Sequence, residues 1–160
     1  TESVVIMRER RATQDPGDHD TYDLIKIAAG AQQAMPLDPP WGLHAWTSCT
    51  PIISLGSLTE ASVTLDPDDL PESSDERIAL LVTELSCNSG QPATGRIELV
   101  ELVETETTVE VVIGVQPSSG GTCPSNPPTP FTVELALSLG DRVIVDGAVF
   151  PAREIAQPPR

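Results

Sequence analysis

Aliphatic side chains alternate with polar or small ones along the second half of this chain. In residues 131–139 every odd position is apolar, and residues 109–115 repeat the alternation with valine and isoleucine. A strand with one buried and one solvated face produces this period of two, and β-branched side chains suit a pleated surface. The sequence therefore predicts β-strands at both places.

The neighbouring segments extend this pattern. Residues 77–85 are apolar in both phases, which fits a central strand buried on both faces, or a helix capped by Ser73 and Glu76. We favour the strand because residues 97–103 and 109–115 follow it as partners. A change of phase within 97–103 indicates a β-bulge, and residues 104–107 then read as a hairpin connection.

Turn signals separate the predicted strands at short intervals. Gly140-Asp141 and Asp146-Gly147 each interrupt the alternation, and the chain contains 11 glycines and 16 prolines. Further strands are predicted at residues 3–7, 22–28 and 60–65, the first of them an edge strand or a swapped strand. Many short strands with frequent turns are typical of an all-β protein, and we predict a β-sandwich, immunoglobulin-like or related.

With 160 residues, the chain has the length of a single domain, and we expect one β-rich domain over residues 1–160. Residues 77–150 form its predicted strand core, and residues 156–160 a tail. Residues 1–76 are the acidic part, because positions 12–76 contain twelve acidic residues and one basic residue.

The charge balance excludes one class of partner. Lys and Arg total 9 against 24 Asp and Glu, for a formal net charge of −15. Such a chain has no basic surface for a nucleic-acid backbone. We also predict no transmembrane segment, because no stretch approaches the roughly 20 apolar residues that a span requires. The start at Thr1 leaves open whether a leader or a lipid anchor precedes it.

The three cysteines allow more than one arrangement. Cys87 and Cys123 lie in turn-rich segments beside predicted strands, where they either form a disulfide that closes a loop around one long hairpin or remain two buried thiols. Cys49 lies outside this stretch. It is either a small buried hydrophobic residue or a thiol that pairs with another chain.

Trp41, His44 and Trp46 are the candidate binding residues. Two tryptophans with a histidine suit stacking against a sugar or a peptide. The ordinary alternative, which we favour, is that they fill the end of a sandwich, since tryptophans are usually mostly buried.

Two charged clusters are candidate binding sites. The carboxylates of Asp15, Asp18, Asp20 and Asp23 lie close in sequence, as Ca²⁺ ligands do, but their spacing does not match an EF-hand. We expect no metal and no cofactor. The cluster of Arg8, Arg10 and Arg11 either meets an acidic partner, including another copy of the chain, or forms a solvated turn, which we favour.

No catalytic constellation appears in the sequence. His19 and His44 are the only histidines, and there is no Gly-x-Ser-x-Gly elbow, phosphate loop or dinucleotide fingerprint. His44 and Cys49 are five apart, so they would face opposite sides of one strand. We therefore predict that the chain is not an enzyme, with a hydrolase built on scattered carboxylates as the remote alternative.

Residues 79–150 resemble a stretch of secreted proteins and lipoproteins of high-GC Gram-positive bacteria (actinobacteria). The residues that carry the resemblance are Cys87-x-x-Gly90, Thr122-Cys123-Pro124 with Asn126-Pro127, Leu139-Gly140-Asp141-Arg142 and Asp146-Gly147. The resemblance implies an extracytoplasmic β-rich domain in which Cys87 is bonded to Cys123. It implies no activity.

These observations together predict a secreted or cell-envelope module that acts by contact, in structure, assembly or partner binding. Cys49 and the apolar segment 4–7 suggest self-association, by addition of a strand to a neighbour's open sheet edge. The alternative is a domain that binds a glycan or a peptide through Trp41, His44 and Trp46.

Overall fold

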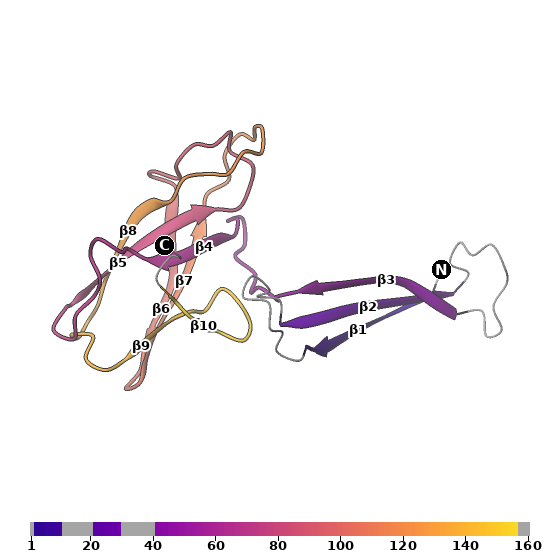
Figure 1. The fold of residues 1–160 in the computed structure, drawn as a ribbon, viewed down its shortest axis with the longest axis horizontal. Helices are drawn as coiled ribbons and strands as arrows, with labels where there is room; N and C mark the ends of the chain where they lie inside the picture. Colours follow the sequence, from indigo (N-terminus) through magenta and orange to yellow (C-terminus); the bar gives the residue numbers. More distant parts are fainter. Residues whose placement is uncertain (1, 11–20, 30–40, 157–160) are drawn as a thin grey trace. The chain divides into compact units, whose positions relative to one another are not determined.

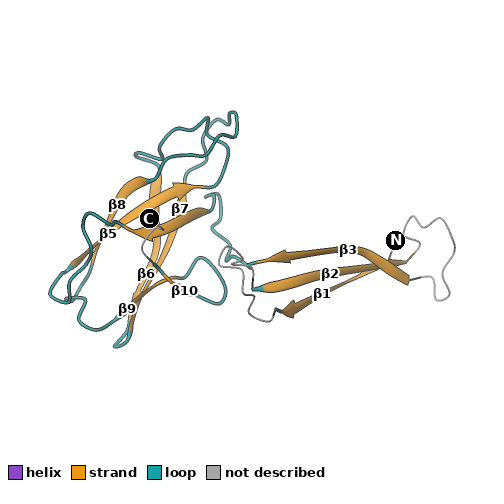
Figure 2. Ribbon diagram, in the orientation of Figure 1, coloured by secondary structure: helices purple, strands orange, loops and turns teal. Residues whose placement is uncertain are grey.

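A computed structural model describes residues 2–10, 21–29 and 41–156. These residues form ten β-strands in three sheets (Figures 1 and 2). None of them is helical, so the described residues contain no helix that could cross a membrane. The predicted all-β class is confirmed.

The strands follow one another at short intervals along the chain. In order they are β1 (Ser3–Glu9), β2 (Tyr22–Ala29), β3 (Trp41–Cys49), β4 (Ala61–Leu65), β5 (Arg77–Glu84), β6 (Ile97–Glu104), β7 (Thr108–Val115), β8 (Thr129–Glu134), β9 (Val143–Asp146) and β10 (Arg153–Glu154).

The chain divides into two compact units, Thr1–Pro51 and Ile52–Arg160, which we call unit 1 and unit 2. The sequence led us to expect one domain, with a change of character between residues 76 and 77. The structure instead places β4 in unit 2, because β4 pairs with β5 along its whole length. The acidic composition of residues 60–76 obscured this pairing.

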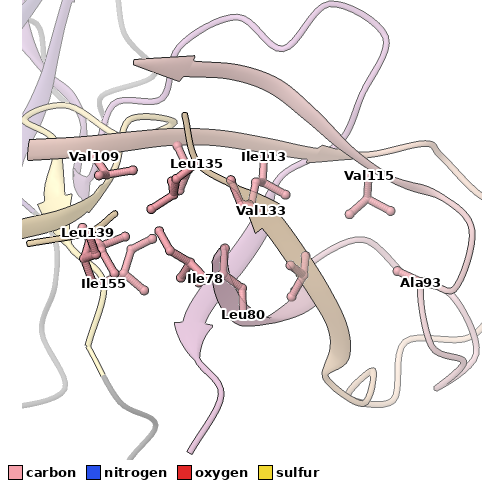
Figure 3. Close-up of a cluster of buried hydrophobic side chains, with 13 residues drawn as sticks. Ile78, Leu80, Ala93, Val109, Ile113, Val115, Val133, Leu135, Leu139 and Ile155 are labelled. Atoms are coloured by element: carbon pink, nitrogen blue, oxygen red, sulfur yellow. The ribbon is translucent and has the colours of Figure 1, made fainter. Parts of the chain in front are cut away.

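Unit 2 is a sandwich of two sheets, ordered β4-β5-β8 and β10-β9-β7-β6. All neighbouring strands are antiparallel except β7 and β9, which are parallel. The aliphatic core between the sheets includes Ile78 and Leu80 of β5 and Val109 and Ile113 of β7, each at most 1% exposed (Figure 3).

Most strand predictions in this unit are confirmed. Residues 77–84 are the central strand of their sheet, so the helical alternative is wrong. The bulge in β6 appears as a register shift between Leu99 and Glu101, and the hairpin joins Glu104 to Thr108. Gly140 has a φ of 62°, as its predicted turn requires.

The strand predicted over residues 131–139 is too long, because β8 ends at Glu134. Beyond it, the side chains of Glu104 and Arg142 bind the backbone: Glu104 accepts from the Ala136 N–H, and Arg142 donates to the carbonyls of residues 137–139. Leu135 and Leu139 still reach the core, while Leu137 is 69% exposed.

Both ends of unit 2 are tied to the sandwich. The Ile53 N–H donates to the Ala148 carbonyl, and Ile155 is 4% exposed in the core. The Ala156 carbonyl accepts from the Leu65 N–H, so the tail predicted from residue 156 does not begin there. Residues 157–160 lie outside the described part.

Cys87 and Cys123 form a disulfide, which the resemblance implied and the residues alone left open. It joins the loop after β5 to the loop before β8. The Ser89 N–H donates to the Thr122 carbonyl beside it, and Gly90 has a φ of 70°. The bond therefore holds together two loops that no strand pairing connects.

Unit 1 is a three-stranded antiparallel sheet in the order β1-β2-β3 (Figure 1). The strands predicted at residues 3–7 and 22–28 are confirmed, and β1 is an edge strand as expected. The strand that contains both tryptophans, β3, was not predicted as one.

Candidate functional site

The sheet of unit 1 carries most of its larger apolar side chains, including both tryptophans, on one face. Residues paired across neighbouring antiparallel strands lie on the same face, and alternate residues of one strand share a face. The register therefore places one set of apolar residues together, which we call the apolar face: Val4, Ile6, Ile25, Ile27, Ala29, Trp41, Leu43 and Trp46.

A bulge in β3 brings the two tryptophans to this face. Trp41 and Trp46 are five positions apart, so strict alternation would put them on opposite faces. The register shifts between Lys26 and Ile27, which leaves His44 as an extra residue without a partner in the β2–β3 register. Trp41 consequently pairs with Ala29 and Trp46 with Ile25, both on the apolar face.

Much of the apolar face is exposed. Trp46 is 63% exposed, Leu43 59% and Val4 50%, and only Asp23 and Ala28 are buried among the described residues of unit 1. We expected the tryptophans to fill the end of a sandwich, and for Trp46 the structure shows the opposite. Because unit 1 contributes only Ala28 to the buried apolar residues, its described part has no aliphatic core of the kind found in unit 2.

The opposite face of the sheet is of mixed character. Its central rows are Val5, Lys26 and Ala45, and then Met7, Leu24 and Thr47. Lysine, threonine and alanine interrupt the larger apolar side chains there. Antiparallel sheets usually bury their more apolar face and leave the mixed one to solvent.

An ion-pair cluster closes one end of the apolar face. Arg8 donates from Nη2 to Asp23 Oδ2 at 2.6 Å, and Arg10 Nε lies 3.4 Å from Asp23 Oδ1. The hydrogen bond from Arg8 does most to lower the pKa of Asp23, burial opposes it, and a hydrogen bond from Trp46 lowers it further. A hollow of about 450 Å³ opens beside Arg8, Glu9, Arg10, Asp23 and Trp46.

This cluster corrects one prediction and bears on another. Arg8 and Arg10, for which we favoured a solvated turn, hold Asp23 instead, and Arg8 lies within β1. Asp23 was one of four carboxylates considered for Ca²⁺, and the other three lie outside the described residues. Within the described part, no three Asp, Glu, His or Cys side chains are placed to hold a metal ion.

The candidate catalytic residues do not form a constellation in the described structure. Cys49 pairs with Tyr22 on the mixed face, and His44 occupies the bulge. His19 lies outside the described residues. Cys49 is free and half-buried.

The notable carboxylates of unit 2 are bound to neighbouring groups. Glu84, whose side chain is fully buried, receives two hydrogen bonds from Arg96, at 2.5 and 3.1 Å. Glu104 Oε2 lies 2.6 Å from Arg142 Nη1, and Asp146 accepts from the Ala148 N–H. Each carboxylate thereby fixes a loop or a strand end.

The residues that carry the resemblance have structural roles. Asn126 donates to the carbonyls of Glu84 and Ser86, which ties the loop before β8 to the end of β5. Arg142 pairs with Glu104 of β6. A Cβ at Gly147 would collide with the carboxylate of Glu110, so its close approach favours glycine there.

Comparison of the chain with protein-family models, with curated proteins and with solved structures finds no match.

Proposed function

We propose that this chain is a non-enzymatic module that binds a protein partner, and that the apolar face of unit 1 is its contact surface. The exposure of this face carries the proposal. Contiguous exposed apolar patches on a folded protein mark interaction sites, because water is displaced from them favourably when a partner binds. Tryptophan is also enriched among the residues that contribute most to binding energy at interfaces.

The rest of the chain supports a role in contact rather than in chemistry. The carboxylates with shifted pKa values, Asp23, Glu104 and Asp146, all hold backbone or arginine groups of the fold. A general acid or base needs to reach a substrate. These groups are engaged in holding the structure instead.

We further propose that the module works outside the cytoplasm, in the cell envelope or secreted, as its resemblance to actinobacterial proteins implies. The Cys87–Cys123 disulfide supports this location, since such bonds persist in oxidising compartments. The net charge of −15 makes a nucleic acid an unsuitable partner.

Site-specific photo-cross-linking tests the contact surface. A benzophenone side chain replaces Trp46 in the full chain, and a matched variant carries it at Leu137, which is 69% exposed in unit 2. We expect protein adducts from position 46 that position 137 does not give, both in purified samples and in cells that make the protein. Equal labelling from both positions, or none from position 46, would refute the proposal.

A small-ligand role is the second candidate, because Trp41 and Trp46 lie on one face and Trp46 is open to solvent. Their partners on β2 are four residues apart, which separates the two indoles by about 13 Å along the sheet. A glycan or peptide would thus span both rings across the bulge at His44. A saturable change in tryptophan fluorescence during a glycan and peptide screen, with no change in mass, would favour this role over protein contact.

A further inference from the structure

The geometry points to a second copy of this chain as the occupant of the apolar face. Two sheets would pack face to face around a two-fold axis that runs across the strands. This inference rests on the proposed function and adds the identity of the partner and the register of the contact.

The apolar face and the residues at its two ends form four rows that run across the three strands. The backbone N–H of Ala29 donates to the Glu2 carbonyl, which extends the β1–β2 register by one pair beyond Ser3. The rows, in order along β1, are Glu2/Ala29/Trp41, Val4/Ile27/Leu43, Ile6/Ile25/Trp46 and Arg8/Asp23/Ser48. Two apolar rows are therefore flanked by one row that ends in an acid and one that ends in a base.

A two-fold axis across the strands exchanges the ends of this pattern. The second row of one copy then lies against the third row of the other, so that Val4 faces Ile6 of the partner subunit and Leu43 faces Trp46 of the partner subunit. Glu2 comes opposite Arg8 of the partner subunit, and the same pair forms a second time by symmetry. Aligned packing of two sheets, about 10 Å apart, accommodates these side chains.

The charges favour this axis over the alternative. The side chain of Arg8 is 61% exposed although it pairs with Asp23, and a guanidinium has five N–H donors, so it can donate to a second carboxylate. Glu2 is exposed at the other end of the same face. A two-fold axis along the strands would set β1 over β3 of the partner subunit and separate Glu2 from Arg8.

The size of the face sets the strength of the contact. Three strands spaced about 4.8 Å apart, over some eight residues, cover roughly 14 by 25 Å. That is a small interface by the standards of stable complexes, so the dimer is expected to be weak, with a dissociation constant in the micromolar range or above. The face suits a copy of itself because one surface supplies both halves of every contact.

Two neighbouring residues of β1 provide a matched test. Ile6 and Met7 are 43% and 54% exposed and lie on opposite faces. Sedimentation equilibrium of the full chain, with Cys49→Ser in every sample to prevent cross-linking, compares Ile6→Glu with Met7→Glu. We expect Ile6→Glu to raise the dissociation constant at least about ten-fold and Met7→Glu to change it less than about two-fold.

Glu2→Arg tests the register without altering the apolar rows. It would place a second guanidinium against Arg8 of the partner subunit, and we expect association about three- to ten-fold weaker than wild type, with the loss reduced at high salt. Far-UV circular dichroism confirms the strand content of each variant. A wild-type monomer at millimolar concentration, or equal effects of Ile6→Glu and Met7→Glu, would overturn the inference.

The cross-linking experiment separates this inference from the proposed function. Adducts from position 46 with twice the chain mass support both. Adducts with a different protein alone would overturn the self-contact and leave the contact function standing. The absence of adducts from that position would remove both.

Discussion

At the scale of single residues, two carboxylates of unit 2 respond to pH in opposite directions. The Ala136 N–H and Arg142 lower the pKa of Glu104 from its ordinary 4.5, so this residue stabilises the fold above that pH and loses the effect as the pH falls through its lowered pKa. Burial raises the pKa of Asp146 above 3.8, so the protonated form favours folding, and this stabilisation is lost as the pH rises through the raised pKa.

Replacement of Glu104 isolates the first of these effects. We expect Glu104→Gln to lower the free energy of unfolding by about 1–2 kcal/mol at pH 7, because Arg142 loses its charged partner. The difference from wild type should shrink as the pH falls below 4.5 and through the lowered pKa of the wild-type carboxylate. Urea unfolding at pH 7 and pH 3 measures it, with Glu106→Gln in the exposed β6–β7 turn as the control.

A second prediction at this scale concerns Gly114 in β7. A Cβ at this position would lie 2.8 Å from the Cβ of Leu58 and 2.9 Å from its Cδ1, and a rotamer change at residue 58 cannot move its Cβ away. We expect Gly114→Ala to destabilise unit 2 by about 1–3 kcal/mol. In a double-mutant cycle with Leu58→Gly, which removes both atoms, additive effects would show that this contact is not the cause.

At the scale of elements, alternation predicted strands where one face packs on the core, and it failed where side chains outside the strand bind its backbone. The phase of residues 131–139 was right, since Val133, Leu135 and Leu139 all reach the core. The predicted end of this strand was wrong because the side chains of Glu104 and Arg142, which are distant in sequence, bind the backbone of residues 136–139. No local pattern contains that information.

The candidate site was less predictable than the strands. Trp41 and Trp46 were named from the sequence, but their common face depends on a register shift against β2. The contribution of Arg8 and Asp23 was missed, because the arginines looked like a turn and the aspartate like part of an acidic loop. Pairing between β1 and β2, across 15 positions, brings the two together.

The disulfide allows a prediction about the two loops that it joins. Cys87 and Cys123 are separated by 36 positions, and in the chain-entropy model such a link stabilises by about 3–4 kcal/mol. We expect Cys87→Ser/Cys123→Ser to lose about 2–4 kcal/mol and to open the loops around Gly90 and Thr122, while β5 and β7 stay protected. Urea unfolding measures the loss of free energy and amide hydrogen exchange measures the opening of the loops. Exchange in β5 and β7 that is faster than this loss of free energy accounts for would contradict a local role.

At the scale of the whole molecule, the two units differ in how they obtain a core. Unit 2 encloses its own, in which Ile78, Leu80 and Ile113 are among the largest fully buried side chains. The described part of unit 1 leaves its apolar face open. The alternation of apolar residues could not reveal this difference, because it occurs in both units. Only the pairing of strands and sheets shows which faces are covered.

Protein concentration should therefore affect the two units differently. Self-association adds its free energy to the folded state of unit 1, so its unfolding temperature should rise across an about fifty-fold increase in concentration. That of unit 2 should stay constant. Differential scanning calorimetry with Cys49→Ser, and with Ile6→Glu as the control that removes the dependence, measures the effect. Two transitions that move together would contradict separate cores.

The extra residue at His44 has a consequence for the length of β3. Because the irregularity adds a single position, a related chain that lacks it needs its two indoles four residues apart, not five, to keep them on the same side. Spacing and strand length should then change together among relatives. Deletion of His44 from this protein removes the extra residue of β3. We therefore expect both indoles to remain on the apolar face in the deletion variant.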